Sequence, residues 1–291
     1  MSEQESLLIN ICGINVNING SYINRALLNY EKAHVNFKVR KTADPCLNIF
    51  FKYTRKHPFP ILNDSIKIFY LSWSNKYARI EYKSKQKELC VTYYGKQYDL
   101  SPADIVGLIF QGVQYVALNC YDGLMLHAAA IIIKSKCFVL LGEPNAGKST
   151  IAKHCFNKYG INSVLCDDII YLNTVFNRLT VYGTPWVGRK TKNEGEKLSA
   201  NIKKGEDKDK KNIVFLVLNK SIKENRIVSM SKIGQIKHLL NSLFHNIRLL
   251  PLKSRKKAIN RLFDLFENIE IKELRFKKGP SVIDFLANYK P

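Results

Sequence analysis

The sequence lacks the patterns that mark membrane, secreted and zinc-binding proteins. Its 291 residues contain no run of about eighteen uncharged apolar residues, so no transmembrane segment is predicted. The seven cysteines are scattered and never spaced as Cys-x-x-Cys, which argues against a disulfide framework and a zinc site. The first residues, Met-Ser-Glu-Gln-Glu-Ser, are acidic and polar, whereas a signal peptide begins basic and turns apolar. These absences predict a cytoplasmic protein.

Acidic residues are also scarce. The chain has 24 Asp and Glu against 46 Lys and Arg, which gives a formal net charge of +22. Such a charge attracts nucleic acid, anionic lipid or acidic proteins. The lysines, however, are spread along the chain rather than gathered with aromatic residues, and an AT-rich coding sequence would give the same abundance of lysine, asparagine and isoleucine. Nucleic acid is therefore not expected as the main partner.

Residues 1–100 are predicted to form a β-rich N-terminal domain. Short apolar or alternating segments are separated by turn signals such as Asn19-Gly20 and Tyr94-Gly95. This region carries no chemical motif, so recognition of an acceptor substrate is the role expected for it. The predicted strands are Leu7–Ile18, Asn36–Arg40, Leu47–Tyr53, Ile66–Trp73, Ala78–Tyr82 and Glu88–Tyr94.

Residues 101–291 are predicted to form an α/β domain. Ser101 and Pro102 resemble the start of a helix over 105–118, after which strands and helices alternate. Residues 189–211 are polar and rich in lysine, which predicts a surface loop. The expected strands are Met125–Ile133, Cys137–Leu141, Ser163–Leu172, Arg178–Tyr182, Ile213–Leu218 and Ile271–Phe276. The expected helices are Lys148–Tyr159, Ile233–His245, Ser254–Phe266 and one that begins at Ser281.

A phosphate-binding loop is the strongest signal in the sequence. It fits G-x-x-x-x-G-K-[ST], follows an apolar strand and precedes a helix. The glycines let backbone N–H groups converge on phosphate oxygens, while Lys148 reaches the β- and γ-phosphates and Ser149 supplies a hydroxyl to Mg²⁺. The segment predicts binding of ATP with Mg²⁺. It comprises Gly142, Glu143, Pro144, Asn145, Ala146, Gly147, Lys148, Ser149 and Thr150.

Two adjacent carboxylates, Asp167 and Asp168, follow the loop on an apolar strand. Phosphoryl transfer to a hydroxyl uses one carboxylate on Mg²⁺ and benefits from a second group that accepts the hydroxyl proton. A GTPase is the rival interpretation, because Asn219-Lys220 resembles the start of an Asn-Lys-x-Asp guanine motif. The fourth position is Ile222, which cannot accept hydrogen bonds from guanine, so Asn219-Lys220 is interpreted as a strand end and turn.

A histidine completes an ordered set of motifs. His127 lies in Leu126-His127-Ala128-Ala129-Ala130, fifteen residues before the phosphate loop, and Gly183-Thr184-Pro185-Trp186 follows the carboxylates. Over about residues 123–188 this set resembles the C-terminal kinase domain of the HPr kinase/phosphorylase family. It is most similar to the smaller HPr-kinase-related proteins, some of them associated with lasso-peptide maturation.

The resemblance implies a P-loop kinase fold of the HPr-kinase/PEP-carboxykinase-like type and transfer to a serine hydroxyl. In the family the histidine holds the first aspartate, which is the base, so Asp167 would be the base and Asp168 the Mg²⁺ ligand; sequence leaves the exchanged roles open. The founding family carries a glutamate and an arginine in a signature loop after the carboxylates. In this chain that region reads Gly183-Thr184-Pro185-Trp186-Val187-Gly188-Arg189. Phosphorylase activity is therefore not expected, and Arg189 is a candidate to assist transfer.

Three functions remain open on the sequence. The leading one is a kinase that acts on a serine of a peptide or small protein, with the C-terminal serine of a ribosomally made peptide as the finer expectation. The second is a kinase for free serine or a sugar. The third is a nucleotide-gated sensor that transfers nothing. A homo-oligomer is a further expectation, because the founding family forms rings.

Overall fold

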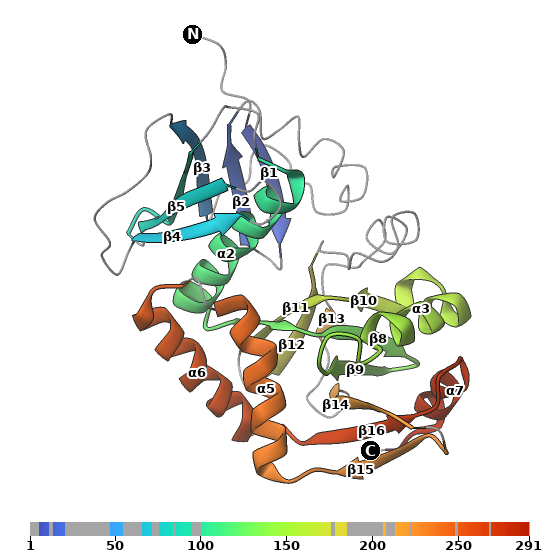
Figure 1. Cartoon of the computed structure of the whole chain (residues 1–291). Coiled ribbons are helices and arrows are strands. Elements are labelled where there is room, and N and C mark those ends of the chain that lie inside the picture. The colour runs from blue at the N-terminus through green and yellow to red at the C-terminus, as the bar shows by residue number, and fades with distance from the viewer. Residues whose placement is uncertain are drawn as a thin grey trace. The chain divides into compact units, whose positions relative to one another are not determined.

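The structure is a computed structural model, and it divides the chain into two compact units (Figure 1). Unit 1 comprises Met1–Tyr121 and Ile247–Lys257, and unit 2 comprises Asp122–Asn246 and Ala258–Pro291. The first boundary between the units therefore falls near residue 122, whereas the domain boundary predicted from the sequence falls near residue 100. The structure describes residues 6–11, 14–20, 47–54, 66–71, 76–83, 85–94, 100–175, 178–184, 206–207, 213–221, 223–247, 250–267 and 269–290.

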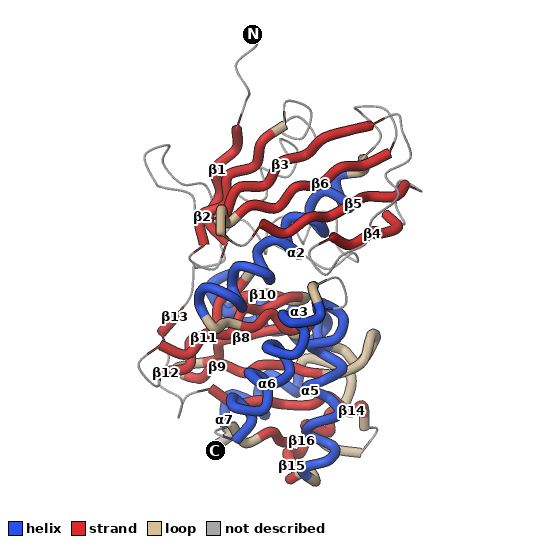
Figure 2. The backbone as a smooth tube through the Cα atoms, turned by 90° about the vertical axis from the view of Figure 1, so that its left-hand side faces the viewer, coloured by secondary structure: helices blue, strands red, loops and turns tan. Residues whose placement is uncertain are grey.

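Unit 1 contains a six-stranded sheet in the order β1-β2-β3-β6-β5-β4 (Figure 2). The β2–β3 and β3–β6 pairs are parallel, and the other pairs are antiparallel. Side chains alternate between buried and partly exposed along β2, as expected for a sheet with one face in a core. The strands are β1 (Ser6–Ile11), β2 (Ile14–Asn19), β3 (Leu47–Thr54), β4 (Ile66–Leu71), β5 (Lys76–Lys83) and β6 (Glu88–Tyr94). The predicted strand Asn36–Arg40 lies outside the described residues.

Helix α2 (Pro102–Tyr121) packs against this sheet, which is why it belongs to unit 1 rather than to the following domain. Its start is the predicted one, because the Ser101 hydroxyl accepts from the Asp104 N–H at 3.1 Å and donates to the Asp104 carboxylate at 2.8 Å. A Cβ on Gly112 would lie 2.8 Å from the Leu89 side chain and 3.2 Å from that of Leu47. The absence of a side chain at Gly112 thus lets the helix approach the sheet closely.

Unit 2 is a mixed α/β structure built on a second six-stranded sheet, in the order β10-β8-β9-β14-β16-β15. The three central strands β9, β14 and β16 run parallel, and β8 and β15 are antiparallel to their neighbours. The strands are β8 (Ala129–Ile133), β9 (Lys136–Leu141), β10 (Val164–Cys166), β14 (Ile213–Lys220), β15 (Arg226–Ser229) and β16 (Ile271–Phe276). Of these, β15 was not predicted from the sequence.

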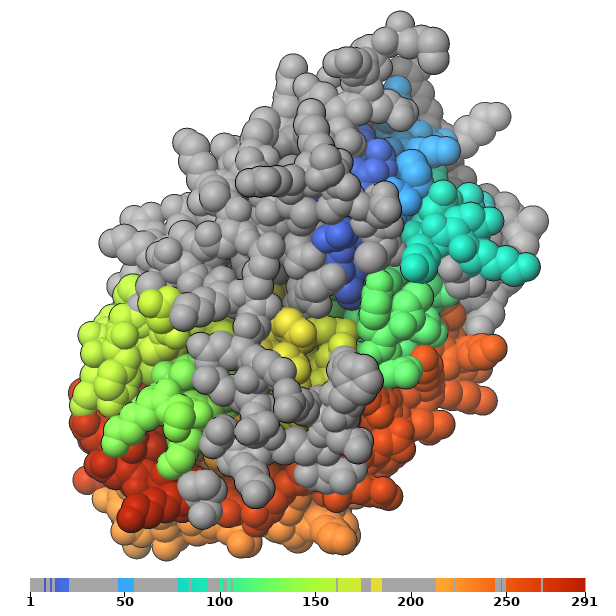
Figure 3. All heavy atoms as spheres, turned by 180° about the vertical axis from the view of Figure 1, so that it is seen from behind, coloured from blue at the N-terminus to red at the C-terminus, as the bar shows by residue number. Residues whose placement is uncertain are grey.

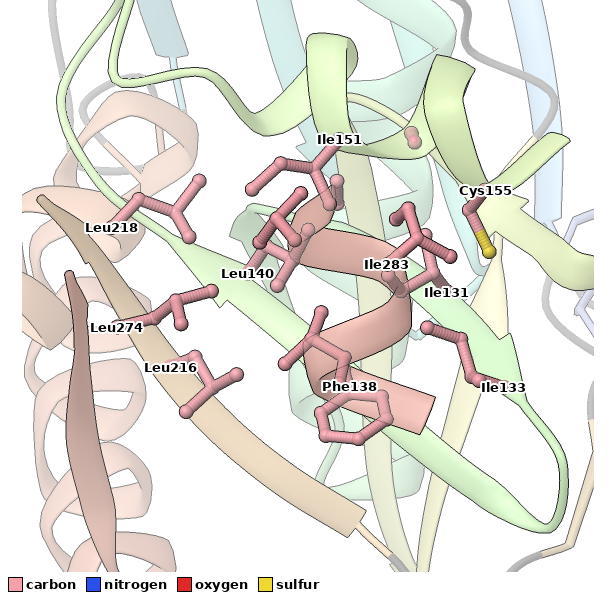
Figure 4. Packing of buried hydrophobic residues seen from close by; sticks show 14 of the residues in the cluster. Ile131, Ile133, Phe138, Leu140, Ile151, Cys155, Leu216, Leu218, Leu274 and Ile283 are labelled. Atoms are coloured by element: carbon pink, nitrogen blue, oxygen red, sulfur yellow. The ribbon is translucent and has the colours of Figure 1, made fainter. Parts of the chain in front are cut away.

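Helices α3 (Lys148–Tyr159) and α7 (Ser281–Asn288) share one hydrophobic core with one face of this sheet (Figure 4). The α3 residues Ile151 and Cys155 and the α7 residue Ile283 are fully buried in it. Figure 3 shows the yellow-green atoms of α3 at the surface beside the red C-terminal atoms, where Lys158 forms an ion pair with Asp284. The strands contribute Ile131, Ile133, Phe138, Leu140, Leu216, Leu218, Leu274 and Phe276.

A four-stranded antiparallel sheet, in the order β13-β12-β11-β7, lies against β8 and β10. Its strands are β7 (Leu124–His127), β11 (Ile169–Val175), β12 (Arg178–Gly183) and β13 (Glu206–Asp207). The sequence predicted one strand over Met125–Ile133 and one over Ser163–Leu172, and in each case the structure has two strands in different sheets. It also pairs β13 with β12, so the stretch predicted as a loop contains a short strand.

The remaining described helices are η2 (Ile161–Ser163), α5 (Lys232–Ile247) and α6 (Leu252–Glu267). Within the described part of the chain, no helix combines the length and hydrophobicity that a membrane span requires. Cys155 and Cys166 are buried thiols, and burial raises the pKa of each to about 11. Neither thiol would ionise near neutral pH.

Two glycines provide a matched test of this packing. A Cβ on Gly123 would lie 2.2 Å from the ring of Tyr171, which is almost fully buried and cannot move aside, so Gly123→Ala should destabilise the protein by about 1–3 kcal/mol. A Cβ on Gly107 in α2 would meet nothing within 4 Å, and Gly107→Ala should stabilise by up to about 1 kcal/mol. Urea unfolding measures both. Equal effects of the two variants would contradict the packing at Tyr171.

Candidate active site

The loop between β9 and α3 has a backbone that requires glycine at both ends. Gly142 has φ 149° and Gly147 has φ 115°, values that L side chains rarely adopt. A Cβ on Gly142 would also lie 2.8 Å from the Ala146 Cβ, and one on Gly147 would lie 2.9 Å from the Phe276 ring. The tight loop predicted from the sequence is therefore present, with its two glycines at the positions that need them.

Lys148 occupies the inside of this loop. Its ammonium donates to the carbonyl oxygens of Gly142 at 2.7 Å and Glu143 at 3.3 Å, and the residue is only 6% exposed. Burial lowers the pKa of Lys148, and the negative charges of Asp168 and Glu143 partly oppose that shift. A polyphosphate would supply the missing negative charge, so a buried lysine here fits a phosphate site.

The start of α3 is also suited to an anion. Its N-cap is Gly147, which has no side chain to cap the N–H groups of the first turn. The hydroxyl-bearing residues Ser149 and Thr150 are exposed in that turn. The first N–H groups of a helix have no partner within the helix, and the helix dipole favours negative charge at this end. The hydroxyl of Ser149 could bind Mg²⁺ beside the phosphates.

The candidate acid–base residues lie where the chain passes from one sheet of unit 2 to the other. It leaves β7 after His127 and enters β8 at Ala129, and it leaves β10 after Cys166 and enters β11 at Ile169. The two passages are neighbours, because Ile169 pairs with His127. This geometry brings His127, Asp167 and Asp168 together although some forty residues separate them.

A second strand pairing, between β8 and β9, places these residues near the phosphate loop. Ala129 pairs with Leu140 on β9, and the loop begins two residues later at Gly142. Asp168 is near enough to Lys148 for its charge to raise the pKa of that lysine. Lys148 therefore lies near Asp168, as a shared site for the predicted residues requires.

His127 forms its close contact with Asp168. The distance from His127 Nδ1 to Asp168 Oδ1 is 3.0 Å, and both side chains are largely buried. Asp167, the preceding residue, is 7% exposed, and its charge contributes to the raised pKa of Cys166. The family resemblance implies a histidine that holds one aspartate of the pair, and here His127 makes such a contact with Asp168.

Thr184 is a site residue that the sequence indicated only as part of a motif. It lies just after β12 and is fully buried. Its hydroxyl donates to the Ile169 carbonyl at 2.6 Å and lies 3.6 Å from the Cys166 sulfur. It thus contacts the chain on both sides of the two aspartates and fixes the position of that turn.

Other residues that support the loop had no usable sequence signal. Asn241 on α5 donates from Nδ2 to Glu143 Oε1 at 2.9 Å, and Lys220 at the end of β14 donates to the Asn145 carbonyl at 2.6 Å. Burial lowers the pKa of His238, one turn before Asn241, and the charge of Glu143 opposes this. These contacts join residues about 75 to 98 positions apart, so only the fold brings them together.

Three residues of the sequence analysis, Pro185, Trp186 and Arg189, lie outside the described residues. Among the residues that are described, no group of three or more His, Cys, Asp and Glu side chains gathers as a metal site. Mg²⁺ is commonly held by one or two carboxylates together with substrate phosphates, so a serine and an aspartate beside a phosphate loop would suffice.

Comparison with known structures gives 61 matching chains. The structure of the Hpr(Ser) kinase/phosphatase from Coxiella burnetii matches with a TM-score of 0.33 and 14% identity, over 56% of this chain and 87% of that chain. No family model and no curated protein matches the sequence.

The hydroxyl of Thr184 can be tested by a pair of substitutions. Thr184→Val keeps the shape but removes a hydrogen bond from the buried Ile169 carbonyl, so it should destabilise by about 1–3 kcal/mol. Thr184→Ser keeps the hydroxyl and loses one methyl group, which should cost about 0.8 kcal/mol. Urea unfolding of both variants measures the difference. A valine variant as stable as the serine variant would show that the hydrogen bond does not hold the turn.

Proposed function

We propose that this chain is an ATP- and Mg²⁺-dependent kinase that transfers the γ-phosphoryl group to a serine hydroxyl of a peptide or small protein. One observation carries the proposal: the buried Lys148 of the phosphate loop lies within electrostatic reach of Asp168, which in turn contacts His127. In this proposal Lys148 binds the transferred phosphoryl group and Asp168 accepts a proton, which their proximity supports.

The proposed reaction assigns Asp168 as the base and Asp167 as the candidate Mg²⁺ ligand. The assignment exchanges the roles implied by the family resemblance, because His127 contacts Asp168. The Asp168 carboxylate accepts the proton of the acceptor hydroxyl as that oxygen bonds to the γ-phosphorus. The bond between the γ-phosphorus and the bridging oxygen breaks, and ADP leaves with the electron pair. His127 orients Asp168 throughout.

Ser149 and the aspartate that does not serve as the base would hold Mg²⁺, which would supply positive charge to offset the negative charge of the phosphates. Lys148 stabilises the charge on the transferred group, and the N-terminus of α3 holds the phosphates that remain with the nucleoside. Arg189 is kept in the proposal as a further cation for the transferred phosphoryl.

The proposal is tested with γ-labelled ATP, Mg²⁺ and three acceptors: a peptide that ends in serine, an HPr-type carrier protein and free serine. Label should reach a peptide or protein acceptor. Lys148→Ala and Asp168→Asn should each lower the rate by about 10²- to 10⁴-fold, because one removes phosphate binding and the other the base. Asp284→Asn on α7 removes the same charge from an exposed residue and should leave the rate unchanged.

The acceptors and variants separate the alternatives. Label on free serine alone would indicate a small-molecule kinase, and label on the peptide that ends in serine would support the finer expectation of peptide modification. If ATP binds but no acceptor is labelled, and Asp168→Asn binds ATP as the parent does, the chain is a nucleotide sensor and the kinase proposal fails.

The lowered pKa of Lys148 gives a prediction on pH. A lysine with a lowered pKa loses its proton at a lower pH than an ordinary lysine, and phosphate binds the protonated form. ATP affinity should therefore hold at low pH and decline as pH rises through the pKa of Lys148. Calorimetric titrations between about pH 7 and pH 10 measure this. Lys148→Arg, which stays charged, should bind ATP with little change over that range. A parallel profile for both proteins would rule out Lys148 as the titrating group.

A further inference from the structure

The end of β14 carries a lysine that the proposed reaction does not use. Lys220 is exposed, and its ammonium donates to the carbonyl oxygen of Asn145 in the phosphate loop at 2.6 Å. The preceding Asn219 donates from Nδ2 to Glu273 Oε1 at 2.9 Å, and Glu273 also accepts from Arg275 at 2.7 Å. The amide of Asn219 is thus engaged with β16, whereas Lys220 faces the loop.

The order of the strands gives the phosphate loop two different sides. The loop follows β9, which has β8 on one side and β14 on the other. The β8 side leads to His127 and Asp168 through the pairing of Ala129 with Leu140. The β14 side leads to Lys220, because Val217 pairs with Leu141 three residues before it. If the γ-phosphoryl group is at Asp168, the nucleoside must leave the loop in another direction, and β14 is the neighbour of β9 on the side away from β8.

Lys220 and Lys148 contact different parts of the loop. Lys220 donates to the Asn145 carbonyl, whereas Lys148 donates to the carbonyls of Gly142 and Glu143. The Lys220 Cε also lies 3.9 Å from the position of a Cβ on Gly147, so the end of the lysine stem lies along the loop next to α3. With its ammonium fixed, the four methylenes form an ordered apolar strip.

We propose that the nucleoside of the bound triphosphate rests on the side chain of Lys220, which makes the β14 side of the loop the nucleoside subsite. The stem would contact the face of the base, and the ammonium beside it would add a cation–π attraction. The inference rests on the proposed function, because it takes the γ-phosphoryl end to be at Asp168. It makes Lys220 a positioning residue for the donor nucleotide, because Lys220 would contact the nucleoside and not the phosphates.

The test compares ATP with inorganic triphosphate, which has the phosphates but no nucleoside. Calorimetry with Mg²⁺ on the full chain gives the dissociation constant of each. In Lys220→Ala, the constant for ATP should rise about tenfold, equivalent to about 1.4 kcal/mol, while that for inorganic triphosphate changes less than about twofold. Lys223→Ala removes the same charge from an exposed lysine three residues later and should change neither constant.

Each other outcome points to a different failure. Equal losses for both ligands in Lys220→Ala would mean that the lysine only supports the loop, and an unchanged ATP affinity would mean that the nucleoside lies elsewhere; either result overturns the inference and leaves the kinase proposal intact. Parent protein that binds neither ligand would overturn both. A melting temperature equal to that of the parent shows that Lys220→Ala is folded, as expected for an exposed side chain.

Discussion

The candidate site depends on one constraint of topology: two segments of the chain cross between the sheets of unit 2 at the same place. A strand that changes sheets must break its ladder for a residue or two, and those residues are released from strand geometry. Here they are Ala128 on one segment and the pair Asp167 and Asp168 on the other. Because Ile169 pairs with His127, neither segment can shift without moving the other. The fold thus holds the histidine and the carboxylates at fixed positions, and Thr184 reinforces this from β12.

The same region contains buried ionisable side chains, whose burial costs folding free energy. Lys148 and Asp167 are both ionisable residues with less than a tenth of their surface exposed, and burial of a charge is expensive. Lys148 is compensated by two loop carbonyls and by the charges of Asp168 and Glu143, and still its pKa remains lowered. A protein that only needed to fold would gain by an apolar side chain at this position. Under the proposed function, the phosphates of bound ATP would compensate the buried charge of Lys148.

The sequence was most informative at the glycine-bearing loop and the helix that follows it. The phosphate loop and the helix Lys148–Tyr159 were predicted with their observed bounds, because glycines, lysine and helix start must all be adjacent there. The sequence failed at Ala128 and at Asp167-Asp168, where apolar residues continue through a change of sheet and the pattern of hydrophobicity does not record it. The contacts of Asn241 and Lys220 could not be predicted, since they arise from tertiary packing.

The two sides of the phosphate loop also suggest how an acceptor would approach. In phosphoryl transfer the attacking and leaving oxygens lie roughly in line through the phosphorus. With the nucleoside and leaving group on the side of β14, the acceptor hydroxyl must arrive from the opposite side, where Asp168 and His127 lie beside β7 and β11. That side is formed by the four-stranded sheet, so under the proposed function the ends of its strands would contact the acceptor hydroxyl, in addition to the acceptor recognition that the sequence predicts for residues 1–100. The passages between the two sheets of unit 2 would then supply the catalytic groups.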